Sequence, residues 1–256
     1  MSSYSYSAIS TSRKCNKLYQ YVYIDKIKPE VAMSGDMLFG TGVHLGLESY
    51  LEGSDGINDF LLFWDIEKTR DNRYGRYSWQ DLREQGVILL TKFKKYYLSK
   101  FEVYNMEQRL YAKYKGINLE GTPDVIGKYE GIESVLDFKT SGARYHKDKV
   151  RTSEQLYLYA YLAEQALGYK ARQIVYLVFV KGSTPSIQTA LKRTIIQEES
   201  LRVLDDLSVE CAKLSEVYNS YQEGFTNSFT RNLNSCIYGE KGECDMLRRC
   251  FPEENK

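Results

Sequence analysis

Two short strand patterns separated by a turn limit the folds that this chain can adopt. Residues 118–128 alternate loosely between apolar and polar side chains, and residues 134–140 form a second, shorter alternating run. Between them, residues 129–131 have the composition of a turn. Two such runs joined by a short connection predict neighbouring strands, which would bring the polar side chains of both runs together.

The polar residues on these predicted strands form one chemical group. Asp124 lies on the first strand, and Asp137 and Lys139 lie on the second. Residues two apart on a strand share a face, so Asp137 and Lys139 should point the same way while Phe138 points into the core. Carboxylates suit a hard cation such as Mg²⁺ or Mn²⁺, whereas a protonated lysine cannot ligate and is better placed to orient or deprotonate water. The set therefore favours metal-assisted hydrolysis of a phosphodiester.

The spacing of these residues resembles that of a known enzyme family. Gly121-x-x-Asp124 and Asp137-x-Lys139 are similar to the motifs of the PD-(D/E)XK nuclease superfamily, particularly its RecB-like branch. That branch includes CRISPR-associated adaptation nucleases and phage exonucleases. The resemblance implies an α/β fold with a mixed central sheet flanked by helices, and a metal-dependent DNA nuclease that we expect to be an exonuclease. On these residues alone, a surface salt bridge beside a turn is the alternative.

A helix is predicted to begin after these strands. Thr152 and Gln155 have the spacing of a capping box, and Gln155 and Tyr159 fall one turn apart on one face. This Gln-x-x-x-Tyr pattern resembles the helix that follows the lysine in the RecB-like branch. The resemblance implies that the two side chains hold a DNA phosphate or orient Lys139. Alternatively, Tyr159 packs with the apolar side chains of its own helix.

A histidine near the start of the chain extends the implied metal site. Residues 40–48 resemble the family's helix that places a histidine at the metal. The implied ligands are His44, Asp124, Asp137 and the carbonyl of Phe138. An imidazole ligand shifts the preference toward Mn²⁺ without excluding Mg²⁺. The alternative is a histidine at the surface or in the core.

The family often carries one more acidic residue before the first of these strands. Glu107 lies at the expected distance, and Glu102 competes for the same assignment. Either residue could instead be a solvated strand residue.

The cysteines form a second group. Five cysteines occur in 256 residues, and we find no signal peptide and no apolar run long enough to span a bilayer. This favours the reducing cytoplasm of a bacterium or of a phage-infected host cell, where clustered thiols usually bind metal. One cysteine of the group lies near the start and three lie near the end: Cys15, Cys236, Cys244 and Cys250.

This one-plus-three order resembles RecB-like nucleases that hold a [4Fe-4S] cluster, which implies a structural cluster that links the chain ends. Seven residues separate Cys236 from Cys244, where the family has two, so a structural zinc site with four thiolate ligands stays open. Unrelated free thiols are the third alternative. Cys211 lies in a helical run and is expected to be a small buried group.

The remaining patterns predict a single nuclease domain over residues 1–256. Its expected parts are a mainly helical part over residues 1–100, the nuclease core over 101–200, and a helix with a cysteine-rich metal-binding tail over 201–256. Helices are predicted over residues 78–100 and 198–221, and strands over 173–180 and 188–196. The small size, without a helicase, favours a phage or mobile-element protein.

The charge pattern points to DNA as the partner. A net charge of +1 excludes a general polyanion binder, but residues 92–97 and 144–151 combine cations with aromatic side chains. Lysines can neutralise phosphates and tyrosines can stack on unpaired bases, which suits a DNA end or single strand. The second segment is the better candidate because it follows Lys139, with a solvated loop as its alternative. A recombination or replication protein is a further expected partner, and a membrane is not.

Two other functions remain open. One is a nucleic-acid-binding subunit of a recombination complex that keeps the fold without hydrolysis, and the other is a restriction-type endonuclease. The complete set of Asp124, Asp137 and Lys139 argues against the first. The same chemistry would serve the second equally well.

Overall fold

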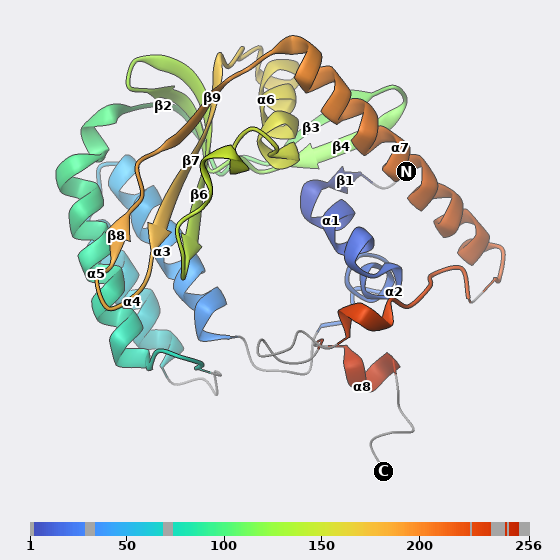
Figure 1. Ribbon diagram of the computed structural model, residues 1–256, viewed down its shortest axis with the longest axis horizontal. Coiled ribbons are helices and arrows are strands. Elements are labelled where there is room, and N and C mark those ends of the chain that lie inside the picture. The colour runs from blue at the N-terminus through green and yellow to red at the C-terminus, as the bar shows by residue number, and fades with distance from the viewer. Residues whose placement is uncertain are drawn as a thin grey trace. The chain divides into compact units, whose positions relative to one another are not determined.

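The computed structural model describes residues 3–28, 34–68, 74–225, 227–236, 244 and 246–250, without the side chains of residues 247 and 248. The chain divides into two compact units, and each is described by itself (Figure 1). The terminal unit comprises Met1–Val31, Tyr111–Glu120 and Leu201–Lys256, and the sheet unit comprises Ala32–Leu110 and Gly121–Ser200. Among the described residues, no helix is long and apolar enough to cross a membrane.

A mixed six-stranded sheet forms the centre of the sheet unit. Its strands are β2 (Phe101–Met106), β5 (Val125–Tyr129), β6 (Ile132–Ser141), β7 (Gln173–Val180), β8 (Ser186–Ile187) and β9 (Leu191–Thr194). They follow the order β2-β5-β6-β7-β8, and β9 also pairs with β7. β6 and β7 are parallel, and the other pairs are antiparallel. The predicted α/β fold with a mixed sheet is confirmed.

Helices cover both faces of this sheet (Figure 1). On one face lie α3 (Gly35–Leu51), α4 (Gly56–Glu67) and α5 (Trp79–Tyr96). Their apolar side chains join Leu136 and Phe138 in one buried core. α6 (Glu154–Leu167) packs on β6 and β7 from the other face. Because side chains alternate along a strand, Asp137 points to the α6 face and Phe138 to the α3 face.

The first predicted strand is in fact two strands. β4 (Ile117–Gly121) and β5 are separated by residues 122–124 and belong to different sheets. Pro123 lies in the break, and proline has no backbone N–H to donate to a strand ladder. The prediction of one strand over residues 118–128 was therefore wrong, whereas the second predicted strand is confirmed as the longer β6.

The start of α6 also differs from the prediction. Ser153 is the N-cap, and its Oγ accepts a hydrogen bond from the Leu156 N–H at 3.2 Å. The Ser153 hydroxyl also lies 2.6 Å from the Tyr176 hydroxyl, which ties the cap to β7. The capping box predicted at Thr152 and Gln155 was wrong by one residue, because this second contact favours serine as the cap.

Close packing of α3 against α4 explains two glycines. A Cβ on Gly46 would lie 2.7 Å from the carbonyl oxygen of Gly56, and a Cβ on Gly56 would lie 1.9 Å from that of Gly46. The two backbones therefore touch, which leaves no room for a side chain at either position. This contact fixes the rotation of α3 and hence the direction in which His44 points.

The other predicted elements of the sheet unit are present with shifted ends. The helix predicted over residues 78–100 is α5 followed by a 3-10 turn, Leu98–Lys100. The strand predicted over 173–180 is β7. The strand predicted over 188–196 is shorter and forms β9.

The terminal unit contains a small three-stranded sheet and a long helix. The sheet has the order β1 (Tyr4–Ser5), β4, β3 (Leu110–Tyr114). The helices are α1 (Tyr6–Lys14), α2 (Asn16–Tyr19), a π-helical turn (Gln20–Ile24), α7 (Gln197–Gln222) and α8 (Leu247–Cys250). The helix predicted over residues 198–221 is confirmed as α7. Cys211 is fully buried in this helix, as predicted.

Candidate active site

Asp124 occupies the point where β5 begins. Its side chain is buried, and Oδ2 accepts a hydrogen bond from the backbone N–H of Phe138. The pairing of β5 with β6 ends at Val125 and Leu136, and continued pairing would place Phe138 opposite Pro123. The Asp124 carboxylate therefore takes over a hydrogen bond that the strand backbone cannot make. This contact fixes Asp124 at the edge of β6.

Asp137 and Lys139 lie side by side on β6, as their spacing predicted. Asp137 is 2% exposed, and its Oδ2 lies 2.6 Å from Lys139 Nζ. The stretch of β6 beyond Leu136 has lost its β5 neighbour, so both side chains lie beside the gap that β5 leaves. Phe138 between them is 1% exposed and packs in the core on the α3 face.

His44 reaches the same gap from α3. Its Nδ1 lies 3.7 Å from Asp124 Oδ2, and its ring packs edge-on against Phe138 with centroids 6.0 Å apart. The backbone of Phe138 lies beside this imidazole. Burial lowers the pKa of His44, which favours a neutral imidazole with a lone pair for a metal.

Gln155 and Tyr159 approach from α6 on the opposite face. Gln155 Nε2 donates a hydrogen bond to Tyr159 Oη at 2.9 Å, which confirms that the two side chains share a face. The ring of Tyr159 lies against Gly121, where a Cβ would come within 2.7 Å of it. Gly121 is thus the glycine that lets Tyr159 approach the acids. Tyr159 is 8% exposed, so its ring is packed in the interior.

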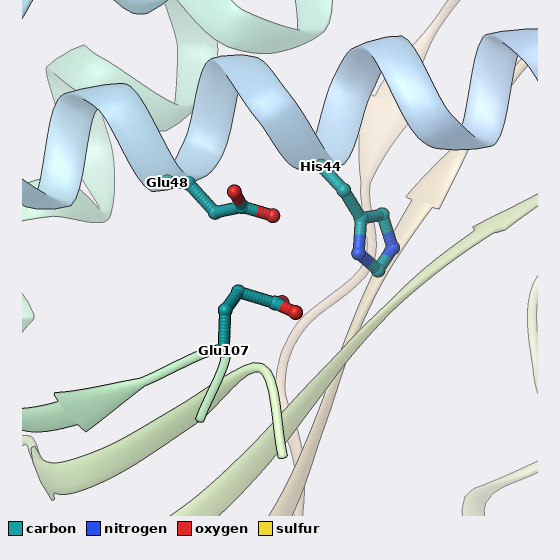
Figure 2. A group of neighbouring side chains, drawn as sticks. All are labelled: His44, Glu48 and Glu107. Carbon is teal, nitrogen blue, oxygen red and sulfur yellow. The ribbon is translucent and has the colours of Figure 1, made fainter. Parts of the chain in front are cut away.

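Two further carboxylates adjoin these residues. Figure 2 shows Glu48 on α3 and Glu107 after β2, with their carboxylates directed toward one another beside His44. Ligand atoms of these three residues lie within 4.8 Å of one another. Glu102, the competing candidate, instead pairs with Lys128 at 3.0 Å on the surface. The structure therefore places Glu107, and not Glu102, beside His44 and Glu48.

Sequence reasoning did not assign a role to Glu48. It lies four residues after His44 on a helix, a spacing that places both on one face, so this signal was present in the sequence. Glu107 adopts a left-handed backbone conformation with φ of 49°, and its N–H donates to the Asp124 carbonyl at 3.4 Å. That turn aims Glu107 back at the site, and no local pattern predicts it.

The crowding of these acids changes their protonation. Burial raises the pKa of Asp137 to about 7, and the nearby Asp124 adds to the rise. Burial likewise raises the pKa of Asp124 to about 6 and that of Glu107 to about 8. Protonated Glu107 can donate its one hydrogen to Asp124 or to Glu48, which adds to the rise of its pKa. Such closely packed carboxyl groups favour binding of either protons or a divalent cation.

Lys139 remains charged in this environment. Burial lowers the pKa of its ammonium, but the ion pair with Asp137 and the charge of Asp124 outweigh burial and leave the pKa raised. At neutral pH the group is therefore a hydrogen-bond donor and not a base. Burial also raises the pKa of Tyr159 to about 12, so its phenol keeps its proton.

The four cysteines of the predicted cluster lie in the terminal unit. Cys15 lies between α1 and α2, Cys236 follows a 3-10 turn (Leu233–Ser235), and Cys250 ends α8. The Cys244 N–H donates to the Cys236 carbonyl at 2.8 Å. Burial raises the pKa of Cys236, and the other three thiols add to that rise. Residues 237–243, between two of them, lie outside the described residues.

Hydrogen bonds join the two chain segments that carry these thiols. The side chains of Asn232 and Ser235 both donate to the Lys14 carbonyl, at 2.9 and 2.8 Å. The Lys17 N–H donates to the Thr230 carbonyl at 2.9 Å. These contacts bring the segment that carries Cys15 beside the segment that carries Cys236.

Comparisons with known proteins concern this site and its fold. The sequence model of the PD-(D/E)XK nuclease superfamily matches residues 3–251. A candidate exonuclease from Eubacterium rectale has a crystal structure similar to this chain, with 12% sequence identity, a TM-score of 0.54, and coverage of 85% of this chain and 82% of its own. At this identity the likeness shows the fold alone.

A second solved structure, that of SSO0001, is matched over 77% of this chain and 84% of its own at 13% identity. Its TM-score of 0.31 is too low to carry an argument. No curated protein matches the sequence.

Proposed function

This chain belongs to the PD-(D/E)XK nuclease superfamily, and on that basis we propose that it is a divalent-cation-dependent deoxyribonuclease, an exonuclease acting on a DNA end or a single strand. The observation that carries the proposal is the meeting of Asp124, Asp137 and Lys139 where β5 begins. Two acids and an ammonium at the open edge of a strand can hold a phosphodiester and the water that attacks it.

The donor set fits a divalent cation. Asp124, Asp137 and the Phe138 carbonyl offer oxygens, and His44 offers a neutral imidazole; these are the residues that would hold Mg²⁺ or Mn²⁺. Glu48 and Glu107 extend the set on the α3 side. A cation bound there would lower the pKa of a bound water and stabilise negative charge on the phosphate oxygens.

Lys139 and the α6 pair would position the reactants. The Lys139 ammonium, held by Asp137, can donate to the attacking water or to a phosphate oxygen. Because Gln155 donates to the oxygen of Tyr159, the Tyr159 hydroxyl hydrogen can be directed to another acceptor, such as a phosphate oxygen. Both donors lie beside the gap that would receive the scissile phosphodiester.

A [4Fe-4S] cluster held by Cys15, Cys236, Cys244 and Cys250 completes the proposal, with a structural zinc ion as the alternative. Supporting it are the effect of the other three thiols on the pKa of Cys236 and the hydrogen bonds that join the segments of Cys15 and Cys236. The cluster's role is structural. Protein purified without oxygen should contain about four iron atoms per chain and absorb broadly in the visible range. Stoichiometric zinc would favour the alternative, and neither metal would refute both.

The form of DNA that is cut distinguishes the nuclease classes. End-labelled linear, nicked and closed circular DNA would each be incubated with Mg²⁺ or Mn²⁺, with chelator as the control. An exonuclease shortens the linear DNA, can begin at a nick and leaves closed circles intact. Cleaved circles would indicate a restriction-type endonuclease, and binding without products would indicate an inactive nucleic-acid-binding subunit.

A further inference from the structure

The loop that joins β6 to α6, residues 142–153, carries a cluster of exposed cations. It connects the strand that bears Lys139 to the helix that bears Gln155 and Tyr159. Its cations are Arg144, Lys147, Lys149 and Arg151, all exposed. Its one aspartate, Asp148, lies 3.3 Å from His146. Within the part of the chain that the structure describes, none of the four cations forms an ion pair.

Several cations elsewhere in the sheet unit are already engaged. Lys100 and Lys192 pair with Glu130, and Arg193 pairs with Glu199. In the other basic segment, residues 92–97, Lys92 donates to the Pro185 carbonyl, while Lys94 and Lys95 lie over tyrosine rings. Of the two basic segments, the β6–α6 loop is thus the one whose charges are available to a ligand.

The loop is held in a defined shape. The side-chain amide of Gln188, itself 8% exposed, accepts from the Tyr145 N–H and donates to the Tyr145 carbonyl, both at 2.8 Å. Val150 is 3% exposed, and Ser153 at the end of the loop contacts the Tyr176 hydroxyl. The backbone is thus anchored at both ends while the charged side chains point outward. Binding of a ligand would therefore cost little conformational entropy in this backbone.

The aromatic ring of the loop is not available for base stacking. Tyr145 is half-buried and packs edge-on against Tyr176, with centroids 6.1 Å apart. The expectation that tyrosines in this segment stack on unpaired bases is therefore wrong for Tyr145, because its ring anchors the loop. What the loop offers outward is mainly guanidinium and ammonium groups, which suit phosphates.

We propose that the β6–α6 loop binds the phosphates of a nucleic acid strand on either side of the phosphodiester in the active site, without reading base sequence. This rests on the proposed nuclease function. The loop starts just beyond Ser141, and two residues of strand rise from Lys139 to Ser141 span about 7 Å. Its cations are therefore within reach of the phosphates next to the one that Lys139 contacts.

Two pairs of substitutions with equal charge change test this loop. Arg144→Ala with Lys147→Ala removes two loop charges, and Lys94→Ala with Lys95→Ala removes two charges from the engaged segment as a matched control. Both pairs are made in an Asp137→Ala background, so that binding of a fluorescent oligonucleotide is measured without cleavage. All four side chains are on or near the surface, and equal unfolding midpoints would verify that the variants fold.

The loop pair should bind DNA about tenfold more weakly at moderate salt, while the control pair should bind like the background. Between about 50 and 200 mM salt, the slope of log K against log salt should fall by roughly 1.4 to 1.8 for the loop pair, since each lost phosphate contact removes about 0.7 to 0.9. Gln188→Ala should weaken binding without changing this slope, because it alters the position of the charges and not their number.

The results separate this inference from the proposed function. If wild-type protein cleaves DNA but the loop pair keeps the affinity and salt slope of the control pair, the loop inference is overturned and the nuclease proposal stands. If wild-type protein cleaves no DNA but the loop pair still loses DNA affinity and salt slope, the nuclease proposal is overturned and phosphate binding by the loop stands. The loop substitutions should weaken binding of poly-A, poly-C and poly-T oligonucleotides equally. A loss of affinity for only one of them would overturn the claim that the loop contacts phosphates without reading bases.

Discussion

The Asp124 carboxylate has a structural contact that explains its position. It accepts the Phe138 N–H at the point where Pro123 ends the pairing of β5 with β6. A buried N–H left without a partner would cost about 1 to 3 kcal/mol. The same side chain therefore stabilises β6 and belongs to the proposed metal site. A substitution of Asp124 would change stability and activity together, so neither effect could be measured alone. Asp137 and Lys139 are the better test positions.

The acids of the site predict how stability depends on pH. The pKa of Asp124 rises to about 6, that of Asp137 to about 7 and that of Glu107 to about 8, mainly through burial. Above pH ~4, these three groups thus hold more protons in the folded protein than in the unfolded chain. The free energy of unfolding, measured with chelator, should therefore fall as the pH rises from about 4 to 8.

A divalent cation should reverse this trend, because it replaces protons in the same site. Denaturant unfolding at several pH values, with chelator or with Mn²⁺, measures both effects. Asp137→Asn should flatten the chelator curve, since it removes one of the titrating groups. Stability that increases steadily from pH 5 to 8 in chelator would contradict the crowding of carboxylates described above.

Gly121 offers a test of the contact between the sheet and α6. A methyl group there would come within 2.7 Å of the Tyr159 ring, so Gly121→Ala should move that ring. We expect a loss of about 1 to 3 kcal/mol in the free energy of unfolding, together with reduced cleavage. Gly75→Ala is the matched control, because nothing lies within 4 Å of its added carbon, and it should change stability by less than about 0.5 kcal/mol. Equal stability of the two variants would show that Tyr159 is not packed there.

At the scale of elements, local patterns predicted the residues that share one strand or one helix face. Asp137 and Lys139 are two apart on β6, and Gln155 and Tyr159 are four apart on α6. Such relations follow from the period of each element. Such patterns could not distinguish Glu107 from its competitor Glu102, because the approach of Glu107 depends on a left-handed residue and on pairing between distant strands.

The break before β5 shows a second limit. Residues 118–128 do alternate between apolar and polar side chains, but they form two strands, β4 and β5, that lie in different sheets. Pro123 was the local signal for the break. Which sheet each half joins depends on distant partners: β4 pairs with β1 near the N-terminus, and β5 pairs with β6.

The cap of α6 gives a prediction for one element. Ser153→Ala should lower the free energy of unfolding by about 1 kcal/mol, because it removes the cap of the Leu156 N–H and the contact with the Tyr176 hydroxyl. Thr152→Ala is the matched control and should have a smaller effect, since Thr152 is exposed and precedes the cap. Urea unfolding measures both. A larger loss of unfolding free energy for Thr152→Ala than for Ser153→Ala would instead support the capping box that the sequence predicted at Thr152.

At the scale of the molecule, the two compact units interleave along the chain. Residues 111–120 belong to the terminal unit, although sheet-unit segments precede and follow them. The strands of the central sheet all come from residues 101–194, and local patterns predicted β6, β7 and β9 among them. β3 and β4 belong to the terminal unit because β4 pairs with β1 at the start of the chain. The periodicity of the sequence does not reveal such a distant partner.

If the four cysteines hold a metal as proposed, the terminal unit should depend on that metal for its stability. Cys236→Ala or Cys250→Ala should lose bound metal and exchange amide hydrogens faster in α1, α2 and the segment around Cys236, while β6 and β7 stay protected. Cys211→Ala is the control and should retain the metal, because Cys211 is buried within α7 and pairs with none of the other thiols in the proposal. Hydrogen exchange with metal analysis measures this. Full metal content in both cluster variants would contradict the assignment.

We propose that the acids and the lysine at the point where β5 begins cleave DNA with a divalent cation. The most direct measurement compares cleavage of labelled linear DNA, with Mn²⁺, by wild-type protein, Asp137→Ala, Lys139→Ala and the surface control Glu102→Gln. Wild-type protein and Glu102→Gln should produce nucleotides at similar rates, and the two site variants should lose more than about 100-fold while folding normally. Cleavage by purified Asp137→Ala or Lys139→Ala at the wild-type rate would contradict the account.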